Sequence, residues 1–236
     1  MLSIVKEKLG EDHEVRAWNL RPLDTCMKAD QAGLTLSTKA CESVCYASRR
    51  NERSERVQDR AKTNFVIAQR SDFAELMIGA IYDSGIKDFR IHSYGDFFSE
   101  SYFAAWNRIV STCSSISFWC YTRAWRQPKF VPLLLDFARK HPANLIVSFS
   151  VDQCSWDVPQ QLLDLPNTRV AGLLLHDDDH LNIACDFYFR AAQNRTTVPL
   201  KVFDNAPVCP HQSGEPLTQK NDRCIRCRIC LPRNTR

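Results

Sequence analysis

The sequence predicts an α/β fold in which parallel strands alternate with helices, and three observations support this. First, the centres of the predicted strands at Ile91, Phe118, Val147, Gly172 and Lys201 lie 27, 29, 25 and 29 residues apart, about the length of one strand-helix crossover unit. Second, the intervening segments carry apolar residues at helical spacing. Third, the strands are continuously apolar, which is typical of a parallel sheet covered by helices on both faces. We expect five or six parallel strands forming an open sheet or a partial TIM-like barrel, with ligands bound at the strands' carboxyl ends.

The individual elements follow in order from about residue 61. A helical pattern runs from Val66 to Ala80 and ends near Ser84-Gly85. A strand at 89–93 leads into the turn Tyr94-Gly95-Asp96, and Ser99 is the expected cap of a helix that buries Tyr102, Trp106 and Ile109. The remaining expected elements are a strand at 116–122, a helix face at 131–138, and strands at 144–151, 170–175 and 200–203.

Composition indicates one globular domain spanning residues 1–236. The chain is 44% hydrophobic and 25% charged, which excludes disordered and fibrous classes. No apolar run approaches the ~18 residues of a membrane helix, and the segment from Met1 to Val15 does not have the pattern of a signal peptide. We therefore expect a cytoplasmic protein that does not contact the membrane.

Eleven cysteines stand out in a chain with no export signal. In a reducing compartment they are better explained as metal ligands or buried residues than as disulfides. Seven lie in two segments that flank the α/β core, 24–50 and 205–236, and these are the predicted metal ligands: Cys26, Cys41, Cys45, Cys209, Cys224, Cys227 and Cys230. The other four, Cys113, Cys120, Cys154 and Cys185, are expected to be small buried hydrophobic residues.

The carboxyl-terminal cysteines form a Cys-x-x-Cys-x-x-Cys run from Cys224 to Cys230, with Cys209-Pro210 upstream as a fourth ligand. Short spacers let three thiolates converge on one inorganic centre, as in bacterial ferredoxins. Four thiolates with two-residue spacers also suit structural zinc. Both an iron-sulfur cluster and zinc therefore stay open for this segment.

The amino-terminal run Cys41-x-x-x-Cys45-x-x-Ser48 resembles the cysteine loop of radical S-adenosylmethionine enzymes, with Ser48 in place of the third cysteine. The third ligand would then be Cys26 or a cysteine of the carboxyl-terminal segment. This resemblance implies a four-iron, four-sulfur cluster with one iron open to S-adenosylmethionine. It also implies that Gly95 and Asp96 take the place of a cofactor-binding Gly-Gly-Glu motif, although an ordinary strand-to-helix turn explains them equally well.

Longer motifs resemble a specific family. The string from Phe89 to Trp106, Cys41-x-x-x-Cys45-Tyr46 upstream and Phe118-Trp-Cys-Tyr-Thr-Arg123 downstream are similar to the phage-encoded gene-product-eighty-eight family. The resemblance spans about residues 24 to 155. It implies a cysteine-bound iron-sulfur centre on a radical-enzyme-like α/β scaffold, in a protein of a phage or mobile element.

Other polar features allow weaker hypotheses. His92 is expected to be a packed core histidine, and His176-Asp-Asp-Asp-His180 a polar loop or a divalent-ion site. The segment from Lys220 to Arg236 has six basic residues against one acidic residue. A basic tail stabilised by zinc or a cluster could bind nucleic acid without catalysis, and a purely structural centre that fastens both chain ends to the sheet is a third possibility.

Overall fold

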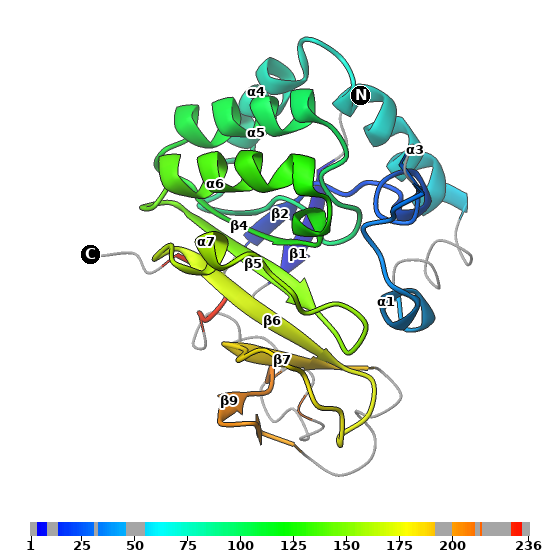
Figure 1. Ribbon diagram of the computed structural model, residues 1–236. Coiled ribbons are helices and arrows are strands. Elements are labelled where there is room, and N and C mark those ends of the chain that lie inside the picture. Colours follow the sequence, from blue (N-terminus) through cyan, green and yellow to red (C-terminus); the bar gives the residue numbers. More distant parts are fainter. Residues whose placement is uncertain are drawn as a thin grey trace.

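The computed structural model describes residues 4–8, 14–30, 33–45, 55–191, 200–210, 213 and 228–232. Its main feature is a seven-stranded sheet in the order of the sequence, curled into a half barrel (Figure 1). The strands are β1 (Val5–Lys8), β2 (Glu14–Ala17), β3 (Asp88–Arg90), β4 (Ser117–Thr122), β5 (Leu145–Val151), β6 (Thr168–Leu174) and β7 (Phe187–Arg190). β1 pairs antiparallel with β2, and the six strands from β2 to β7 are parallel. The expected parallel sheet and partial barrel are confirmed.

The helices lie on one face of this sheet, not on both. The helices and turns are η1 (Pro22–Asp24), α1 (Lys39–Ser43), α3 (Glu55–Ala68), α4 (Phe73–Ser84), α5 (Glu100–Thr112), η2 (Ala124–Arg126), η3 (Pro128–Phe130), α6 (Val131–Lys140) and α7 (Gln160–Leu163). Because successive strands are neighbours and their crossovers are right-handed, the connecting helices must fall on the same face. Figure 1 shows α4, α5 and α6 stacked over that face. The expectation of helices on both faces is therefore wrong.

The opposite, inner face is covered by a short piece of the carboxyl-terminal segment. Val15, Trp119 and Ile146 pack there against Leu231, with Cys230 beside them. This contact joins β2, β4 and β5 to residues 228–232. Residues near the end of the chain thus fill part of the hollow of the half barrel.

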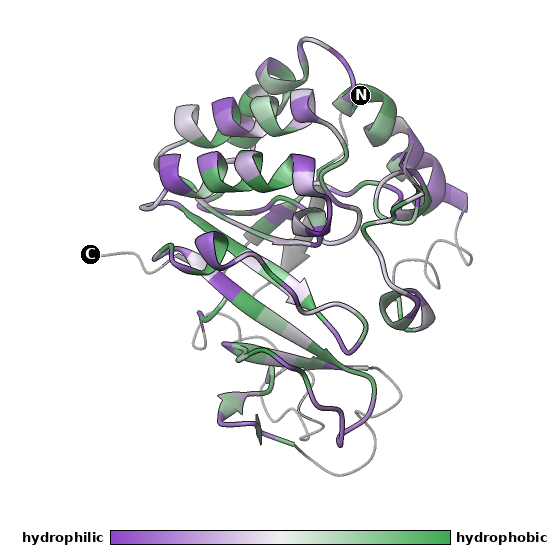
Figure 2. Ribbon diagram, in the orientation of Figure 1, coloured by the Kyte–Doolittle hydropathy of each residue, from purple (hydrophilic) through white to green (hydrophobic). Residues whose placement is uncertain are grey.

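Local sequence signals explain most of the elements. Ser99 caps α5 by accepting a hydrogen bond from the Tyr102 amide, and Tyr102, Trp106 and Ile109 are buried as expected. Gly85 ends α4 in the left-handed conformation at φ 63°. In Figure 2 the helices over the sheet carry both hydrophilic and hydrophobic residues, as expected of amphipathic elements with one face on a core.

Two predicted elements differ from the structure. The helical pattern around residues 66–80 belongs to two helices, α3 and α4. The predicted strand at 200–203 is not in the parallel sheet, because Val202–Phe203 (β8) pairs antiparallel with Ala206–Pro207 (β9). The sixth parallel strand is β7, which follows β6 after only twelve residues with no intervening helix. A prediction that expects a helix between successive strands therefore misses β7.

Among the described residues, no helix is long and apolar enough to cross a membrane.

Candidate functional site

The candidate site lies at the carboxyl ends of β3, β4 and β5, where polar residues from three neighbouring strands meet. Asp96 follows β3, Arg123 follows β4, and Asp152 follows β5. The chain leaves the carboxyl end of β2 at Ala17, so the segment that carries Cys26, Cys41 and Cys45 begins at this same edge. Parallel α/β sheets bind ligands at this edge.

Asp96 joins β3 to β4. It is buried, and its Oδ1 accepts hydrogen bonds from Thr122 Oγ1 at 2.6 Å and from the Phe97 amide at 2.8 Å. Its Oδ2 accepts from the Arg123 amide at 2.7 Å. Burial raises the pKa of Asp96 to about 6, although these three hydrogen bonds oppose the rise. All these bonds are internal, as the turn interpretation of Asp96 expects, and the cofactor role of Asp96 stays a prediction.

Close packing of the Leu20 backbone requires a glycine at position 95. It has φ 84°, and a Cβ added there would lie 2.6 Å from the Leu20 carbonyl oxygen. The Leu20 amide donates to the Tyr94 carbonyl at 3.1 Å, so the backbone at Leu20 lies directly against the turn that contains Gly95. Only glycine combines this conformation with so close an approach. The same geometry brings the start of the cysteine segment against the turn after β3.

Asp96 also holds the first cysteine in place. Its amide donates to Thr25 Oγ1 at 3.2 Å, and Thr25 directly precedes Cys26. Cys26 is half-buried, and its Sγ lies 3.5 Å from the Pro22 carbonyl oxygen. Burial raises the pKa of the Cys26 thiol, and the charges of Asp96, Cys41 and Cys45 raise it further. Cys26 therefore lies within electrostatic range of the other two cysteines of its segment.

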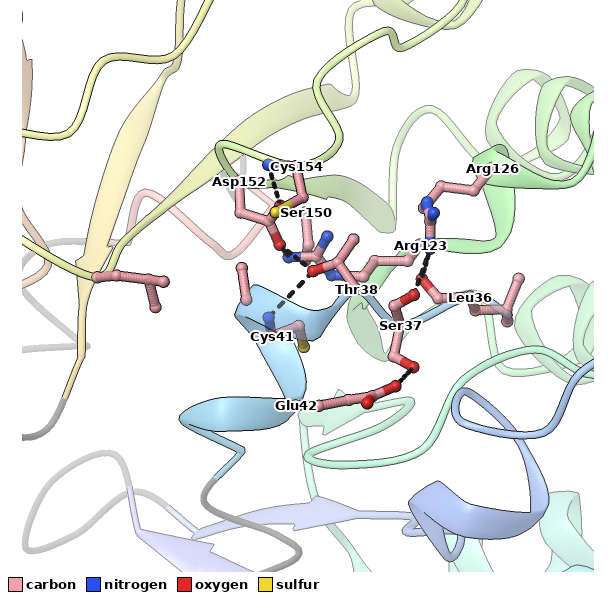
Figure 3. A network of polar contacts seen from close by, with 12 residues as sticks. Leu36, Ser37, Thr38, Cys41, Glu42, Arg123, Arg126, Ser150, Asp152 and Cys154 are labelled. Atoms are coloured by element: carbon pink, nitrogen blue, oxygen red, sulfur yellow. Dashed lines mark hydrogen bonds and ion pairs between the residues drawn. The ribbon is translucent and has the colours of Figure 1, made fainter. Parts of the chain in front are cut away.

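Asp152 holds the second cysteine through a buried polar network (Figure 3). Its carboxylate is fully buried, and Oδ2 accepts from Thr38 Oγ1 at 2.6 Å and pairs with Arg123 Nη2 at 2.9 Å. Thr38 is the N-cap of α1, and its Oγ1 accepts from the Cys41 amide at 3.0 Å. Oδ1 of Asp152 accepts from the Cys154 amide at 2.8 Å. One carboxylate therefore fixes the helix of Cys41, the guanidinium of Arg123 and the loop of Cys154.

The charge around Cys41 is mixed. Burial raises the pKa of its thiol, the Arg123 guanidinium lowers it, and the charges of Cys45, Asp152 and Asp96 raise it. Arg126 is nearby, and its Nη1 donates to the carbonyls of residues 35, 36 and 37, which fixes the loop before α1. A cavity of about 550 Å³ borders this region and shares Arg126 with it; its lining also includes Trp125, Ser155 and Asp157.

The carboxyl-terminal cysteines are placed in part. Cys224 and Cys227 lie outside the described residues. Cys209 is fixed by a 2.8 Å bond from its amide to the Tyr188 carbonyl, and Cys230 packs on the inner face beside Tyr121. Burial raises the pKa of Tyr121, and the charges of Cys230 and Cys209 add to the rise. Cys209 and Cys230 thus lie near Tyr121, whereas Cys41 lies near Arg123.

Within the described ranges, no three His, Cys, Asp or Glu side chains lie close enough together to hold a metal ion. A single zinc ion needs its thiolates to converge at about 2.3 Å from one point. A four-iron cluster binds each thiolate through a different iron and so spreads its ligands. Cys26, Cys41 and Cys45 are half-buried, and their role as ligands of a cluster or an ion stays a prediction.

The four cysteines outside the two cysteine segments differ in burial. Cys113 and Cys120 are buried as predicted, but Cys154 is exposed and Cys185 only half-buried, so those two predictions are wrong. Both lie in loops between elements and not inside them, which explains the error. His92 is a core residue as expected: it is buried, with Nε2 at 2.8 Å from the Tyr102 hydroxyl.

The acidic stretch 176–180 behaves as a loop. Asp179 Oδ2 accepts from the amides of Leu175 and His176, and Asp177 pairs with the buried Arg190. These contacts use two of its three carboxylates to hold the chain after β6.

Sequence reasoning places Arg123 and Asp152 at the carboxyl ends of their strands, where ligands are expected, but gives them no partner, and it missed Thr38. Threonine is a favoured N-cap residue, so Thr38 could be recognised in the sequence as the start of a helix. Arg123 and Asp152 each follow a predicted strand, and parallel strands bring such positions together. Their pairing, however, depends on strand order, which spacing alone does not give.

Comparison with known proteins supplies the family. The model of a family described as Gene product 88 matches residues 5–233. The Gene 88 protein of Mycobacterium phage D29 is 28% identical over 207 residues, covering 83% of this chain and 76% of that protein. The Gene 88 protein of Mycobacterium phage L5 is 26% identical over 209 residues, with the same coverage. No solved structure matches the chain. Since the family model covers nearly the whole sequence, the chain belongs to the Gene product 88 family.

Proposed function

We propose that this protein binds a four-iron, four-sulfur cluster through Cys26, Cys41 and Cys45 at the carboxyl edge of the half barrel. The observation that carries the proposal is the grouping of these three thiols, which lie within electrostatic range of one another. The Asp96 amide, after β3, donates to Thr25, which directly precedes Cys26. The Asp152 carboxylate, after β5, accepts from Thr38, the N-cap of the helix that carries Cys41. This anchoring holds the thiols at the edge where α/β sheets bind ligands.

The resemblance of the Cys41-x-x-x-Cys45 spacing to the cysteine loop of radical enzymes favours a cluster over zinc at this position. Half-burial favours a cluster as well, because partial exclusion of water protects its thiolates and sulfides. Zinc remains the alternative for the carboxyl-terminal group.

A second centre is proposed for Cys209, Cys224, Cys227 and Cys230. Cys209 and Cys230 both lie beside Tyr121, which supports a shared site. Cys41 of the amino-terminal segment has different charged neighbours, Arg123, Asp152 and Asp96, which favours two centres over one.

The radical-enzyme interpretation is the finer part of the proposal. Three protein thiolates leave one iron of a four-iron cluster without a protein ligand, and S-adenosylmethionine would occupy that iron. Once reduced by an external electron donor, such a cluster would supply the electron for reductive cleavage of the bound sulfonium. The residues of this chain would orient the ligand and exclude water, with Gly95 and Asp96 proposed at the turn nearest Cys26. Calorimetric titration of the cluster-loaded protein with S-adenosylmethionine tests this part.

The test of the cluster is chemical analysis of protein purified without oxygen. We expect iron and acid-labile sulfide, together with a broad absorption band near about 400 nm. Cys41→Ala should lower the iron and sulfide content, and Cys185→Ala, a half-buried thiol in the loop between β6 and β7, should leave both unchanged. Zinc without iron in the wild-type protein would reject the cluster and leave a structural metal site.

A further inference from the structure

The cavity that Arg126 borders lies at the carboxyl edge of the sheet, between the chain segments that follow β4 and β5. Its volume is about 550 Å³, within the roughly 300–1,000 Å³ of small-molecule sites. One wall is η2, which follows β4, and another is the segment after β5 that contains Ser155 and Asp157. Trp125 and Val131 add apolar walls, and the described residues of the lining include no cysteine. The cavity therefore lies where α/β sheets bind ligands, apart from the thiols.

Arg126 places a fixed positive charge on the wall of this cavity. Its side chain is half-buried, and Nη1 donates to the carbonyls of residues 35–37, so the guanidinium is held in one orientation. Within the described ranges Arg126 makes no ion pair. Asp157 is the acidic residue of the lining, but its side chain is exposed, so water and salt screen its charge more strongly than that of Arg126. The cavity thus favours an anion.

Arg123 brings a second guanidinium to the same turn. It is the N-cap of η2, which contributes Trp125 and Arg126 to the cavity wall. Arg123 is 5% exposed, and its Nη2 pairs with Asp152 at 2.9 Å, whereas its buried Nη1 has no hydrogen-bond partner in the described part of the chain. Burial lowers the pKa of Arg126 and the charge of Arg123 lowers it further, so the two guanidinium groups lie within electrostatic range. Because buried donors are normally paired, Nη1 indicates a missing acceptor.

We propose that this cavity binds a small molecule through a carboxylate or phosphate group, and that Arg126 and Arg123 bind that group. Both anions present several lone pairs to the planar fork of an arginine. Such a group would supply the acceptor that Arg123 Nη1 lacks and would offset the repulsion between the two cations. Trp125 and Val131 would contact the rest of the molecule. This site does not depend on the proposed cluster, because its lining and its charges come from other residues.

The test is a titration of the full chain with inorganic phosphate and, separately, with acetate, at constant ionic strength. The reporter is the indole N–H of Trp125, which lines the cavity and donates to the Ser150 carbonyl at 3.3 Å. Its nuclear magnetic resonance signal in isotope-labelled protein is identified by its loss in Trp125→Phe. A saturable shift of this signal measures the affinity for each anion.

Two variants remove the proposed anion-binding groups. Arg126→Gln removes the guanidinium on the cavity wall, and Arg123→Gln/Asp152→Asn removes the other one without leaving a buried carboxylate unpaired. The matched control is Arg108→Gln, which removes a guanidinium from an exposed ion pair with Glu75.

We expect a saturable shift with at least one anion, a loss of affinity of about tenfold or more in each arginine variant, and wild-type affinity in the control. Tighter binding of phosphate identifies a phosphate-bearing ligand, and tighter binding of acetate a carboxylate. No saturable shift with either anion, or wild-type affinity in both arginine variants, would overturn the inference. If those variants do not fold, Asp157→Asn decides, because this residue is exposed. Removing its negative charge should tighten anion binding about two- to fivefold, and unchanged or weaker binding rejects the site.

Discussion

The buried carboxyl group of Asp96 makes a quantitative prediction about the pH dependence of stability. In the folded protein its pKa is raised from 3.8 to about 6 by burial. A carboxyl whose folded pKa lies above its unfolded value favours the folded state when protonated. Its contribution is therefore present below about pH 4 and is lost as the pH rises through 6. A shift of about 2 units corresponds to about 3 kcal/mol at 1.36 kcal/mol per unit.

The perturbation is Asp96→Asn, which removes the titration. Wild type and variant would be unfolded in urea at several values between about pH 4 and pH 7. The free energy of unfolding of the wild type, minus that of the variant, should fall by about 2 kcal/mol across this range, because part of the full difference is already lost at pH 4. Other titrating groups contribute equally to both proteins and cancel in the difference. A difference that stays constant with pH would show that Asp96 is not held in a desolvated site, and would refute the reasoning.

Three further predictions concern the turn, the core and the tail. Gly95→Ala should lower the melting temperature, because it combines φ 84° with a 2.6 Å contact; Gly79→Ala, with nothing within 4 Å in helix α4, should raise it slightly. Burial lowers the pKa of His92 to about 3, so its neutral form stabilises the fold above about pH 6.5 and that contribution is lost as the pH falls toward 3. His92→Gln should therefore weaken the acid sensitivity of urea unfolding, and an unchanged pH profile would contradict this. If the basic tail binds nucleic acid, the affinity of the full chain for a short duplex should fall steeply with salt, whereas no binding at low salt would remove that hypothesis.

The sequence predicted the core of the fold well and its edges poorly. β4 and β5 begin and end within one residue of their expected limits, because long apolar runs between helices are a strong local signal. β2 and β7 have only four residues each, too few for a strong local signal, and β2 pairs with β3, which is distant in the sequence. The contacts of Thr25 and Thr38, which precede Cys26 and Cys41, are with residues after other strands, so no local pattern contains them.

Arg123 and Asp152 illustrate that limit. They are 29 positions apart and make an ion pair only because β4 and β5 are parallel neighbours in register. Thr38 joins them from 114 positions before Asp152. A single sequence shows each residue type, but the contact arises from topology. Gly95 is similar, since the Leu20 carbonyl that excludes a side chain belongs to a segment 75 positions earlier.

The packing of Leu231 on Val15, Trp119 and Ile146 has a consequence for biosynthesis. Strands β2, β4 and β5 are complete once residue 151 has emerged from the ribosome, but the residue that covers their inner face is translated 80 positions later. During that interval the growing chain presents an uncovered apolar hollow to the cell. Nascent chains arrested before residue 228 should bind chaperones and aggregate more readily than the released protein.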